Sequence, residues 1–289
     1  MKRQRDCRSA SSAVLLMTVI VSGVITVPHP SSAAMARRYY IPFMAKNIVP
    51  KGIGLYAGNC DLLDMLNVSW YYSGEPSCEG YEFVEYITCR GDVGRKKPTS
   101  YTLLWNEPEY RTESIEEMVG AFVPLAEAHP EVIWIGPCPA NDLGLIPAFW
   151  REFERQADWA MPPERIRVCV HCYASAGACM QRVAAAAGIG EAMGIPSPSV
   201  WLTEFGQPLG LNLTIYEQVT EMSRLVDALK ASPDIERFAY WPGILRAGVD
   251  VWNGKYSSWQ PLAFERYSWD RQTLLEPGLT DVGLMYRDK

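Results

Sequence analysis

Short runs of apolar and β-branched residues alternate with longer segments whose apolar residues recur every three or four positions. The short runs are typical of buried strands, and the longer segments are typical of amphipathic helices. The clearest helical segment is 114–129, because Glu116 and Glu117 also place negative charge in its first turn. Eight strands are predicted in this way, over residues 53–57, 68–73, 81–88, 101–105, 132–136, 166–170, 200–203 and 237–241.

The order of these elements favours one barrel. Strands that alternate with helices pair in parallel through right-handed crossovers. A doubly wound sheet is the alternative, but no glycine-rich phosphate loop follows the first strand. We therefore predict an α/β fold with a single (β/α)8 TIM barrel, in which the helices around strands two to four are reduced and residues 274–286 close the ring. Helices are predicted at 60–67, 114–129, 145–156, 177–193 and 213–232.

The N-terminal segment has the pattern of an export signal. Residues 13–27 are apolar or small and uncharged, and small residues follow at 32–34. A basic start, an apolar stretch and small residues form the order of a secretory signal peptide, and an uncleaved anchor is the alternative. We predict a signal peptide at 1–34, one barrel domain at 35–289, and a secreted or cell-envelope location. The basic residues of the start are Lys2, Arg3, Arg5 and Arg8.

Composition narrows the class of partner. Removal of residues 1–34 from the 289-residue chain leaves about 255 residues, the usual length of one (β/α)8 barrel. The chain carries a net charge of −6 and has no basic run beyond its start, so we expect no nucleic-acid partner. No basic amphipathic helix is evident, so we expect no membrane contact after signal cleavage. We also expect a monomer. The 33 aromatic residues fit either a tyrosine-rich core or a sugar-binding cleft.

The cysteines allow disulfides. Seven of the eight lie beyond the signal segment, and an odd number predicts at least one free thiol. Cys169 and Cys172 form a C-x-x-C spacing, but strand residues three apart face opposite sides, which disfavours a metal or redox site. A cysteine hydrolase is disfavoured for a similar reason, since the adjacent His171 and Cys172 also face opposite ways. We expect no metal and no cofactor. The seven are Cys60, Cys78, Cys89, Cys138, Cys169, Cys172 and Cys179.

Two glutamates follow predicted strands in a similar way. Glu107 lies in LLWNEPE after the fourth strand, and Glu204 lies in VWLTEFG after the seventh. Active groups of such barrels come from the C-terminal ends of strands, and strands four and seven face each other across the ring. Glycoside hydrolysis needs one protonated and one ionised carboxyl group, about 5–5.5 Å apart for retention and about 6.5–9.5 Å apart for inversion. One such glutamate is usually a solvated loop residue, but the pair predicts a glycosidase.

These motifs carry a family resemblance. In this order and spacing they resemble the clan of retaining glycosidases with catalytic glutamates on strands four and seven. More narrowly, residues 53–286 resemble the glycosyl hydrolase catalytic-core family that includes glycoside hydrolase family 128 β-1,3-glucanases and related cell-wall proteins. The third strand differs from that family in having no Trp at its end. The matching segments are LLWNEPE, VIWIGP, VHCY, VWLTEFG, the YW pair of strand eight and GLTDVGLMY.

The resemblance implies roles for individual residues. It makes Glu107 the general acid/base and Glu204 the nucleophile of a secreted retaining enzyme that cleaves β-glucan by double displacement. Asn106 would bind the sugar 2-hydroxyl group, and His171 and Tyr173 would orient the nucleophile or line the cleft. The implied partner is a polysaccharide or oligosaccharide substrate. Candidate aromatic platforms for sugar rings are Trp70, Tyr72, Trp105 and Trp241.

A non-catalytic alternative uses the same barrel. A secreted polysaccharide-binding or cell-wall-binding protein would keep the cleft without hydrolysis. Core packing explains each of the four aromatic residues equally well, and a structural role explains His171 equally well. The presence of both Glu107 and Glu204 favours the enzyme.

Overall fold

The computed structural model describes residues 49–54, 60–72, 78–206, 214–241, 244–246, 263–267, 274–279 and 281–289. The predicted signal peptide at 1–34 lies outside these ranges and stays a prediction. Within the described ranges, no helix combines the length and the apolar character needed to cross a bilayer.

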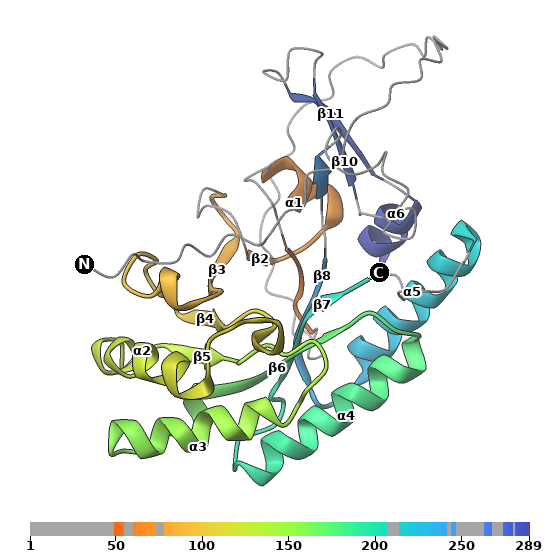
Figure 1. Ribbon diagram of the computed structural model, residues 1–289. Helices are drawn as coiled ribbons and strands as arrows, with labels where there is room; N and C mark the ends of the chain where they lie inside the picture. The colour runs from red at the N-terminus through yellow and green to blue at the C-terminus, as the bar shows by residue number, and fades with distance from the viewer. Residues whose placement is uncertain are drawn as a thin grey trace, which may run out of the picture. The chain divides into compact units, whose positions relative to one another are not determined.

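Eight parallel strands form a closed barrel in chain order (Figure 1). β1 pairs with both β2 and β8. The predicted (β/α)8 fold is therefore confirmed. The strands are β1 (Lys51–Gly54), β2 (Trp70–Tyr72), β3 (Glu82–Ile87), β4 (Tyr101–Leu104), β5 (Ile133–Ile135), β6 (Ile166–Cys172), β7 (Val200–Phe205) and β8 (Ile235–Tyr240).

Helices cover the outside of the barrel, and the five predicted helices are confirmed to within two residues at each end. The first turn of α2 is fixed by a capping box between Ser114 and Glu117. The side around β3 is thin as predicted, since only a 3-10 turn at Arg90–Asp92 separates β3 from β4. The helices are α1 (Cys60–Leu66), α2 (Ile115–Ala128), α3 (Leu145–Ala157), α4 (Ala176–Ala192), α5 (Ile215–Ala231) and α6 (Asp281–Asp288).

The C-terminal segment differs from its prediction. The ring closes by pairing of β1 with β8, and residues 274–286 do not supply a barrel strand. They form β11 (Leu274–Leu279) and most of α6, while β11 pairs with β10 (Ala263–Tyr267) and β10 with β9 (Ile244–Arg246) in a separate three-stranded sheet. Tyr286 of α6 donates a 2.7 Å hydrogen bond to the carbonyl of Gly52 in β1. The segment therefore covers the seam of the barrel instead of completing it.

Strand alternation divides the apolar side chains into two cores. In β6, Cys169 belongs to the cluster inside the barrel, whereas Val168, Val170 and Cys172 belong to the layer between strands and helices. Cys169 and Cys172 therefore face opposite sides, as predicted. The inner cluster consists of Trp70, Tyr72, Val84, Tyr86, Leu103, Ile135, Cys138, Cys169, Trp201 and Ala239.

The cysteines pair across elements. Because Cys169 bonds to Cys138 and Cys172 bonds to Cys179, the C-x-x-C spacing does not form one site. A third disulfide joins Cys60 and Cys78, and Cys89 is disulfide-bonded as well, so none of the cysteines in the described part of the chain is free. The predicted free thiol is thus not found among the described residues of the full-length chain. The prediction concerned the seven cysteines of a chain cut after residue 34, whereas the whole sequence has eight, and it stays a prediction for the cut chain.

An arginine closes the N-terminal end of the barrel. The guanidinium carbon of Arg237 lies 4.4 Å from the ring centre of Tyr101 and 4.7 Å from that of Trp201. Its Nη1 atom forms a 2.6 Å ion pair with Glu82. The Trp70 ring lies 5.8 Å from the same guanidinium group and is fully buried. This aromatic box stabilises the barrel at the end opposite the C-terminal strand ends.

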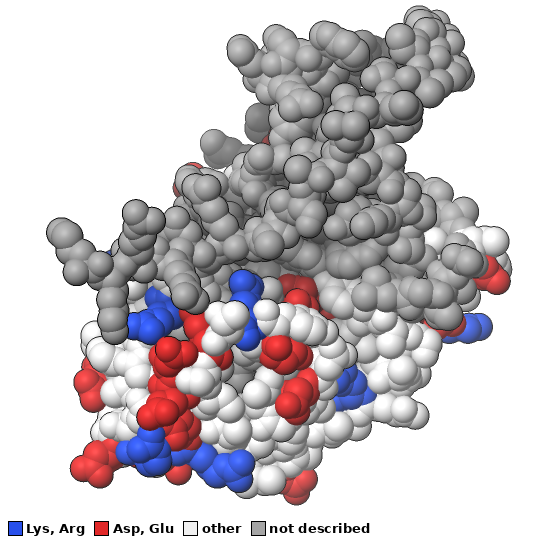
Figure 2. All heavy atoms as spheres, in the orientation of Figure 1, with Lys and Arg blue, Asp and Glu red and all other residues white. Residues whose placement is uncertain are grey.

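Exposed charges on α2 and α3 contrast with this buried one. Figure 2 shows acidic and basic side chains mixed over the face formed by these helices. Arg155 lies 2.5 Å from Glu152 and 3.6 Å from Glu116, with 62% of its side chain exposed. Exposed pairs of this kind contribute little to stability, because water solvates both charges and side-chain freedom is lost.

We expect Arg237→Met to lower the free energy of unfolding by about 1–3 kcal/mol, because it removes a desolvated cation from three aromatic faces. Arg155→Met is the matched control and should change stability by no more than about 0.5 kcal/mol. Urea unfolding followed by tryptophan fluorescence measures both. Equal effects of the two substitutions would show that the aromatic box does not stabilise the barrel.

Candidate active site

The end of β4 leaves regular strand geometry. Trp105 and Glu107 both adopt left-handed backbone conformations, with φ values of 54° and 46°. For side chains this large, such conformations cost about 1–3 kcal/mol each and are concentrated at functional sites. They turn the Trp105 side chain into the helix-side core beside Leu104, where it is 1% exposed. The turn brings Asn106 to Tyr86 of β3, whose hydroxyl donates a 2.6 Å hydrogen bond to Asn106 Oδ1.

The loop after β5 holds this turn in place. The amide of Glu107 donates to the carbonyl of Cys138 over 2.9 Å, and the amide of Cys138 donates back to the carbonyls of Leu104 and Trp105. Gly136 has a φ of 132°, and a Cβ there would lie 2.6 Å from the Leu104 carbonyl oxygen, so the close approach of the two segments requires glycine.

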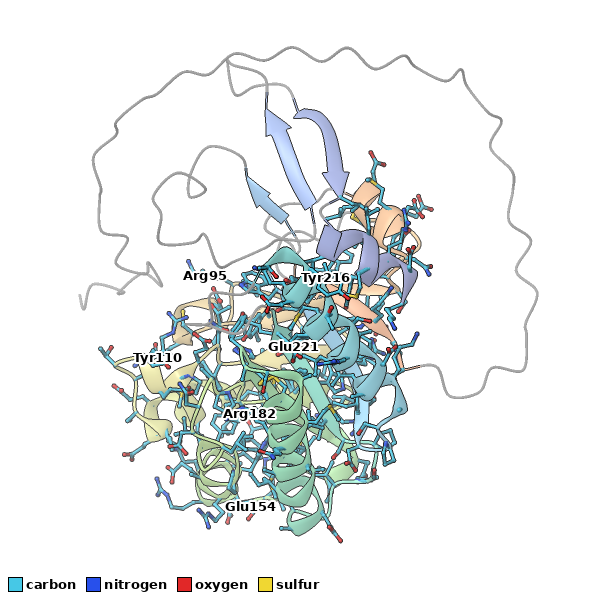
Figure 3. All side chains as sticks on the ribbon, turned by 90° about the vertical axis from the view of Figure 1, so that its right-hand side faces the viewer. Arg95, Tyr110, Glu154, Arg182, Tyr216 and Glu221 are labelled. Atoms are coloured by element: carbon cyan, nitrogen blue, oxygen red, sulfur yellow. A yellow bond between two sulfur atoms is a disulfide. The ribbon has the colours of Figure 1, made fainter. Side chains whose placement is uncertain are left out.

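Two long side chains from the helices fix the same loop. Trp150 of α3 donates to the Gly136 carbonyl over 2.9 Å. Arg182 of α4 donates to the carbonyls of Asn141 and Pro139 over 3.1 and 3.4 Å (Figure 3). The loop that supports Glu107 is therefore tied to α3 and α4.

A bulge in β7 turns Glu204 inward. Leu202 pairs with Val170 of β6 and Glu204 pairs with His171, so Thr203 is an extra residue in β7. Trp201 faces the barrel interior, and simple alternation would therefore turn Glu204 outward. The extra residue reverses this, as bulges beside active sites do, and Phe205 takes the outward position in the helix-side core.

Tyr72 of β2 stabilises the bulge from across the barrel. Its hydroxyl donates a 2.6 Å hydrogen bond to the Thr203 carbonyl. Burial raises the pKa of Tyr72 well above its usual value, and the charge of Glu204 adds to this effect. The side chain therefore stays a phenol and keeps its donor proton. Thr203 received no role in the sequence analysis, because a bulge is visible only when the partner strand is known.

Folding brings the two glutamates to one histidine. The Nδ1 atom of His171 lies 3.2 Å from Glu107 Oε1 and 3.4 Å from Glu204 Oε2. A carboxylate oxygen of Glu107 and one of Glu204 lie within 4.8 Å of each other, although the residues are far apart in the sequence. Tyr173 donates a 2.7 Å hydrogen bond to Glu204 Oε2. Four of the predicted site residues therefore meet at one place.

The two carboxylates have different surroundings. The Glu107 side chain is 27% exposed, whereas that of Glu204 is 8% exposed. Burial raises the pKa of Glu204; His171 and the hydrogen bond from Tyr173 oppose this shift, and the charge of Glu107 adds to it. Burial also raises the pKa of Tyr173, so its hydroxyl remains a donor to Glu204. One carboxyl group is thus open to solvent and the other is enclosed.

The remaining predicted residues divide into two groups. Trp241 is partly exposed and stacks on Tyr72, with ring centres 5.8 Å apart and planes 18° apart. A Cβ on Gly54 would lie 2.0 Å from the Trp241 ring, so glycine at the end of β1 makes room for this stack. Trp70 and Trp105 are not brought to the site. Trp70 packs beside Arg237 at the other end of the barrel, and the left-handed turn places Trp105 in the outer core.

Sequence reasoning missed three further features of the site: Tyr86, the Thr203 bulge and the Cys138–Cys169 disulfide. Tyr86 could have been found from strand alternation, since it lies on the same face of β3 as Val84 in the inner cluster. The disulfide gave no sequence signal, because pairing of cysteines cannot be read from spacing.

Two sets of side chains have the separations of metal ligands among the described residues. In the first set, Cys138 and Cys169 are joined to each other and offer no thiolate, which also removes them as nucleophiles. The second set is Glu107, His171 and Glu204, whose ligand atoms lie within 4.8 Å of one another. Here the Nδ1 atom of His171 lies within 3.4 Å of both carboxylates, whereas its buried Nε2 atom has no hydrogen-bond partner among the described residues.

Known structures share this fold. An endo-β-1,3-glucanase of glycoside hydrolase family 128 from Amycolatopsis mediterranei, in complex with laminarihexaose, matches with a TM-score of 0.60 at 18% identity, over 83% of this chain and 99% of its own. An exo-β-1,3-glucanase of that family from Cryptococcus neoformans matches with a TM-score of 0.59 at 15% identity, over 82% and 98%. A third member, an endo-β-1,3-glucanase from Pseudomonas viridiflava, has a TM-score of 0.56 at 17% identity, over 83% and 97%. Neither the models of protein families nor the curated proteins give a match.

The raised pKa of Glu204 has a consequence for stability. A carboxyl group with a higher pKa in the folded than in the unfolded state destabilises the fold progressively as the pH rises above the unfolded value. We therefore expect Glu204→Gln to raise the thermal unfolding midpoint at pH 7, and this gain to vanish below the ordinary glutamate pKa of 4.5. Calorimetry of both proteins between pH 3.5 and 7.5 measures the difference. A gain that is constant with pH would contradict the assigned burial.

Proposed function

We propose that the protein is a retaining glycoside hydrolase that cleaves β-1,3-glucan with Glu107 as acid/base and Glu204 as nucleophile. The carrying observation is that one carboxylate oxygen of Glu107 lies within 4.8 Å of one carboxylate oxygen of Glu204. An inverting enzyme needs about 6.5–9.5 Å between its carboxylates to hold a water molecule, whereas a retaining enzyme uses about 5–5.5 Å. The close pair therefore supports double displacement.

The first half of the reaction forms a glycosyl-enzyme. Glu107 donates its proton to the glycosidic oxygen while ionised Glu204 attacks the anomeric carbon, so the carbon–oxygen bond breaks as the ester bond to Glu204 forms. In the second half, the Glu107 carboxylate takes a proton from water, and the water oxygen attacks the anomeric carbon. Glu204 then leaves as a carboxylate, and Glu107 is protonated again.

The exposure of Glu107 suits its role, and for Glu204 the hydrogen bond from Tyr173 opposes the rise in pKa that burial causes. Glu107 is the more exposed group, as an acid/base needs in order to meet the leaving oxygen and then water. Glu204 is enclosed, and the hydrogen bond from Tyr173 to Oε2 stabilises its ionised form and orients the carboxylate. Because Asn106 Oδ1 accepts from Tyr86, its amide nitrogen is the donor for the sugar 2-hydroxyl group.

The substrate class follows from the fold neighbours together with this site. The neighbours named above are β-1,3-glucanases of endo and exo type, and one is in complex with laminarihexaose. At 15–18% identity their likeness concerns the fold, so the site geometry carries the step from fold to activity. We also propose that the enzyme acts outside the cell, which the signal-like N-terminal segment and three disulfides support.

We expect Glu107→Gln and Glu204→Gln each to lower kcat on laminarin by about 10²–10⁴-fold or more, because each removes one half of the acid/base and nucleophile pair. Glu154→Gln, on the exposed face of α3, is the control and should remain within twofold of the wild type. Release of reducing sugar measures all three. Retention of laminarin by an inactive wild-type protein would instead favour the non-catalytic binding protein.

Azide separates the two roles. On an activated aryl β-glycoside, Glu107→Ala should give a β-glycosyl azide, because azide replaces water in the second displacement. Glu204→Ala should give an α-glycosyl azide, because azide then attacks the substrate directly in a single inversion. Nuclear magnetic resonance of the product distinguishes the anomers, and the opposite pattern would exchange the two assignments.

The pH profile tests the hydrogen bond from Tyr173. This hydrogen bond favours the ionised form of Glu204. Tyr173→Phe should therefore raise the pKa of Glu204 further and move the acidic limb of the kcat/KM profile to higher pH. Tyr216→Phe, in the exposed first turn of α5 (Figure 3), should leave the limb unmoved. A limb that stays in place, or moves to lower pH, in Tyr173→Phe would remove Tyr173 from the account.

A further inference from the structure

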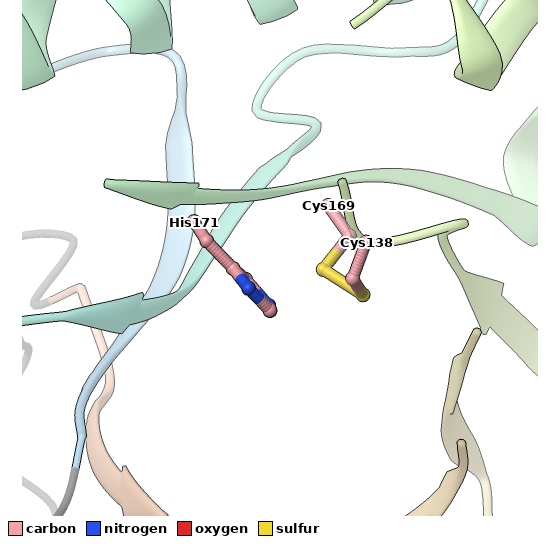
Figure 4. Close-up of side chains that lie close together, drawn as sticks. All are labelled: Cys138, Cys169 and His171. Carbon is pink, nitrogen blue, oxygen red and sulfur yellow. A yellow bond between two sulfur atoms is a disulfide. The ribbon is translucent and has the colours of Figure 1, made fainter. Parts of the chain in front are cut away.

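A disulfide lies under the candidate site. Cys138 and Cys169 are both fully buried in the cluster inside the barrel. Cys169 and His171 project from the same side of β6, two residues apart, so the cystine lies beside the histidine that bridges the glutamates (Figure 4). Sulfur atoms of both cysteines and a ring nitrogen of His171 lie within 4.8 Å of one another.

One half of this cystine supports Glu107. The Cys138 carbonyl accepts the 2.9 Å hydrogen bond from the Glu107 amide, and the Cys138 amide donates to the carbonyls of Leu104 and Trp105. The same residue forms an isolated bridge with Asn106. No side chain caps the turn that starts at Glu107. The backbone of Cys138 therefore holds its first residue, while the amide of Asn141 holds its second turn residue by donating to Glu109 Oε1 over 2.6 Å.

The other half supports Glu204. The Sγ atom of Cys169 lies 3.1 Å from the Thr203 hydroxyl, and Thr203 is the extra residue that turns Glu204 inward. The cystine therefore spans from the turn at the end of β4 to the bulge in β7.

The strand pairing beside the cystine is short. β5 pairs with β6 only through Trp134 with Ile166 and Ile135 with Arg167, at the start of β6. Beyond the last pair of the ladder, the disulfide is the covalent link between the two segments, beside the 3.3 Å hydrogen bond from the His171 amide to the Pro139 carbonyl. Removal of the disulfide would leave the position of the Cys138 segment relative to β6 to hydrogen bonds alone.

We propose that the Cys138–Cys169 cystine is a positioning element that holds Glu107 and Glu204 at their catalytic separation. This inference rests on the proposed function and adds that a covalent bond constrains the separation of the two glutamates. Displacement of a catalytic group by about 1 Å costs about 100-fold in rate, so a small shift of either segment is enough to impair turnover. The cystine touches no reacting atom and acts through the backbone at Glu107 and through Thr203 beside Glu204.

The same strand supplies a matched control. Cys172 lies three residues after Cys169 on the opposite face of β6 and bonds to Cys179 of α4. This bond links the strand to a covering helix, and both residues belong to the helix-side core. Replacement of either pair removes one buried disulfide anchored on β6. Cys172 meets β7 only through backbone pairing with Phe205, which alanine keeps, whereas the inner cystine lies against the Thr203 hydroxyl and fixes the segment that holds the Glu107 turn.

The test compares C138A/C169A with C172A/C179A at 25 °C, after circular dichroism has shown that both are folded. We expect the inner variant to lose about 10–100-fold in kcat with KM within twofold, and its acidic limb of kcat/KM to move to lower pH as Glu204 becomes better solvated. The outer variant should keep kcat within twofold and an unmoved limb. Wild-type kcat and pH profile in the inner variant would overturn the proposal, whatever its loss of thermal stability.

A second measurement needs no substrate. The pH-dependent gain in unfolding midpoint from Glu204→Gln should be smaller in the C138A/C169A background than in the wild type, and unchanged in C172A/C179A. An equal gain in all backgrounds would overturn the positioning role. If the wild type cleaves no laminarin, the proposed function fails, but this measurement still decides whether the cystine holds Glu204. Should C138A/C169A not fold, C138A/C169V restores part of the lost volume and gives the same readouts.

Discussion

The extra residue at Thr203 determines which way Glu204 faces, and the rest of the site depends on that one departure from strand alternation. Without it, Glu204 would lie among the apolar side chains under the helices. Tyr72 holds the bulge by its hydrogen bond to the Thr203 carbonyl, and Cys169 contacts the Thr203 hydroxyl. A residue that no chemical step requires is therefore needed for the two carboxylates to meet.

Both glutamates lower the stability of the folded state. Glu107 stands on a left-handed backbone, and Glu204 is a carboxylate in a buried position. His171 and Tyr173 offset part of the burial, because each favours the ionised form of Glu204. The aromatic box around Arg237 and the helix-side core lie away from this site. They stabilise the folded state, which the site itself does not. This division between a stable base and a strained C-terminal face is common in barrels whose loops carry function.

The sequence predicts the features of this fold that depend on local periodicity. Alternation places Cys169 and Cys172 on opposite faces of β6, and the glutamates at strand ends identify the face that bears the site. Features that depend on a partner strand cannot be predicted from local periodicity. The bulge at Thr203 exists only relative to β6, and the left-handed turn that sends Trp105 outward depends on the loop at Cys138. In the sheet of β9, β10 and β11, the parallel pairing of β9 with β10 joins two short strands with 16 residues between them, so no local pattern reveals it.

The central claim is that Glu204 forms a covalent bond to the sugar while Glu107 moves the proton. A 2-deoxy-2-fluoro-β-laminaribiosyl fluoride should trap this intermediate, because the fluorine slows its hydrolysis more than its formation. Mass spectrometry of the digested protein should then find one added disaccharide on the peptide that contains Glu204. Attachment to Glu107 or to any other residue would contradict the account, as would laminarin cleavage with inversion at the anomeric carbon.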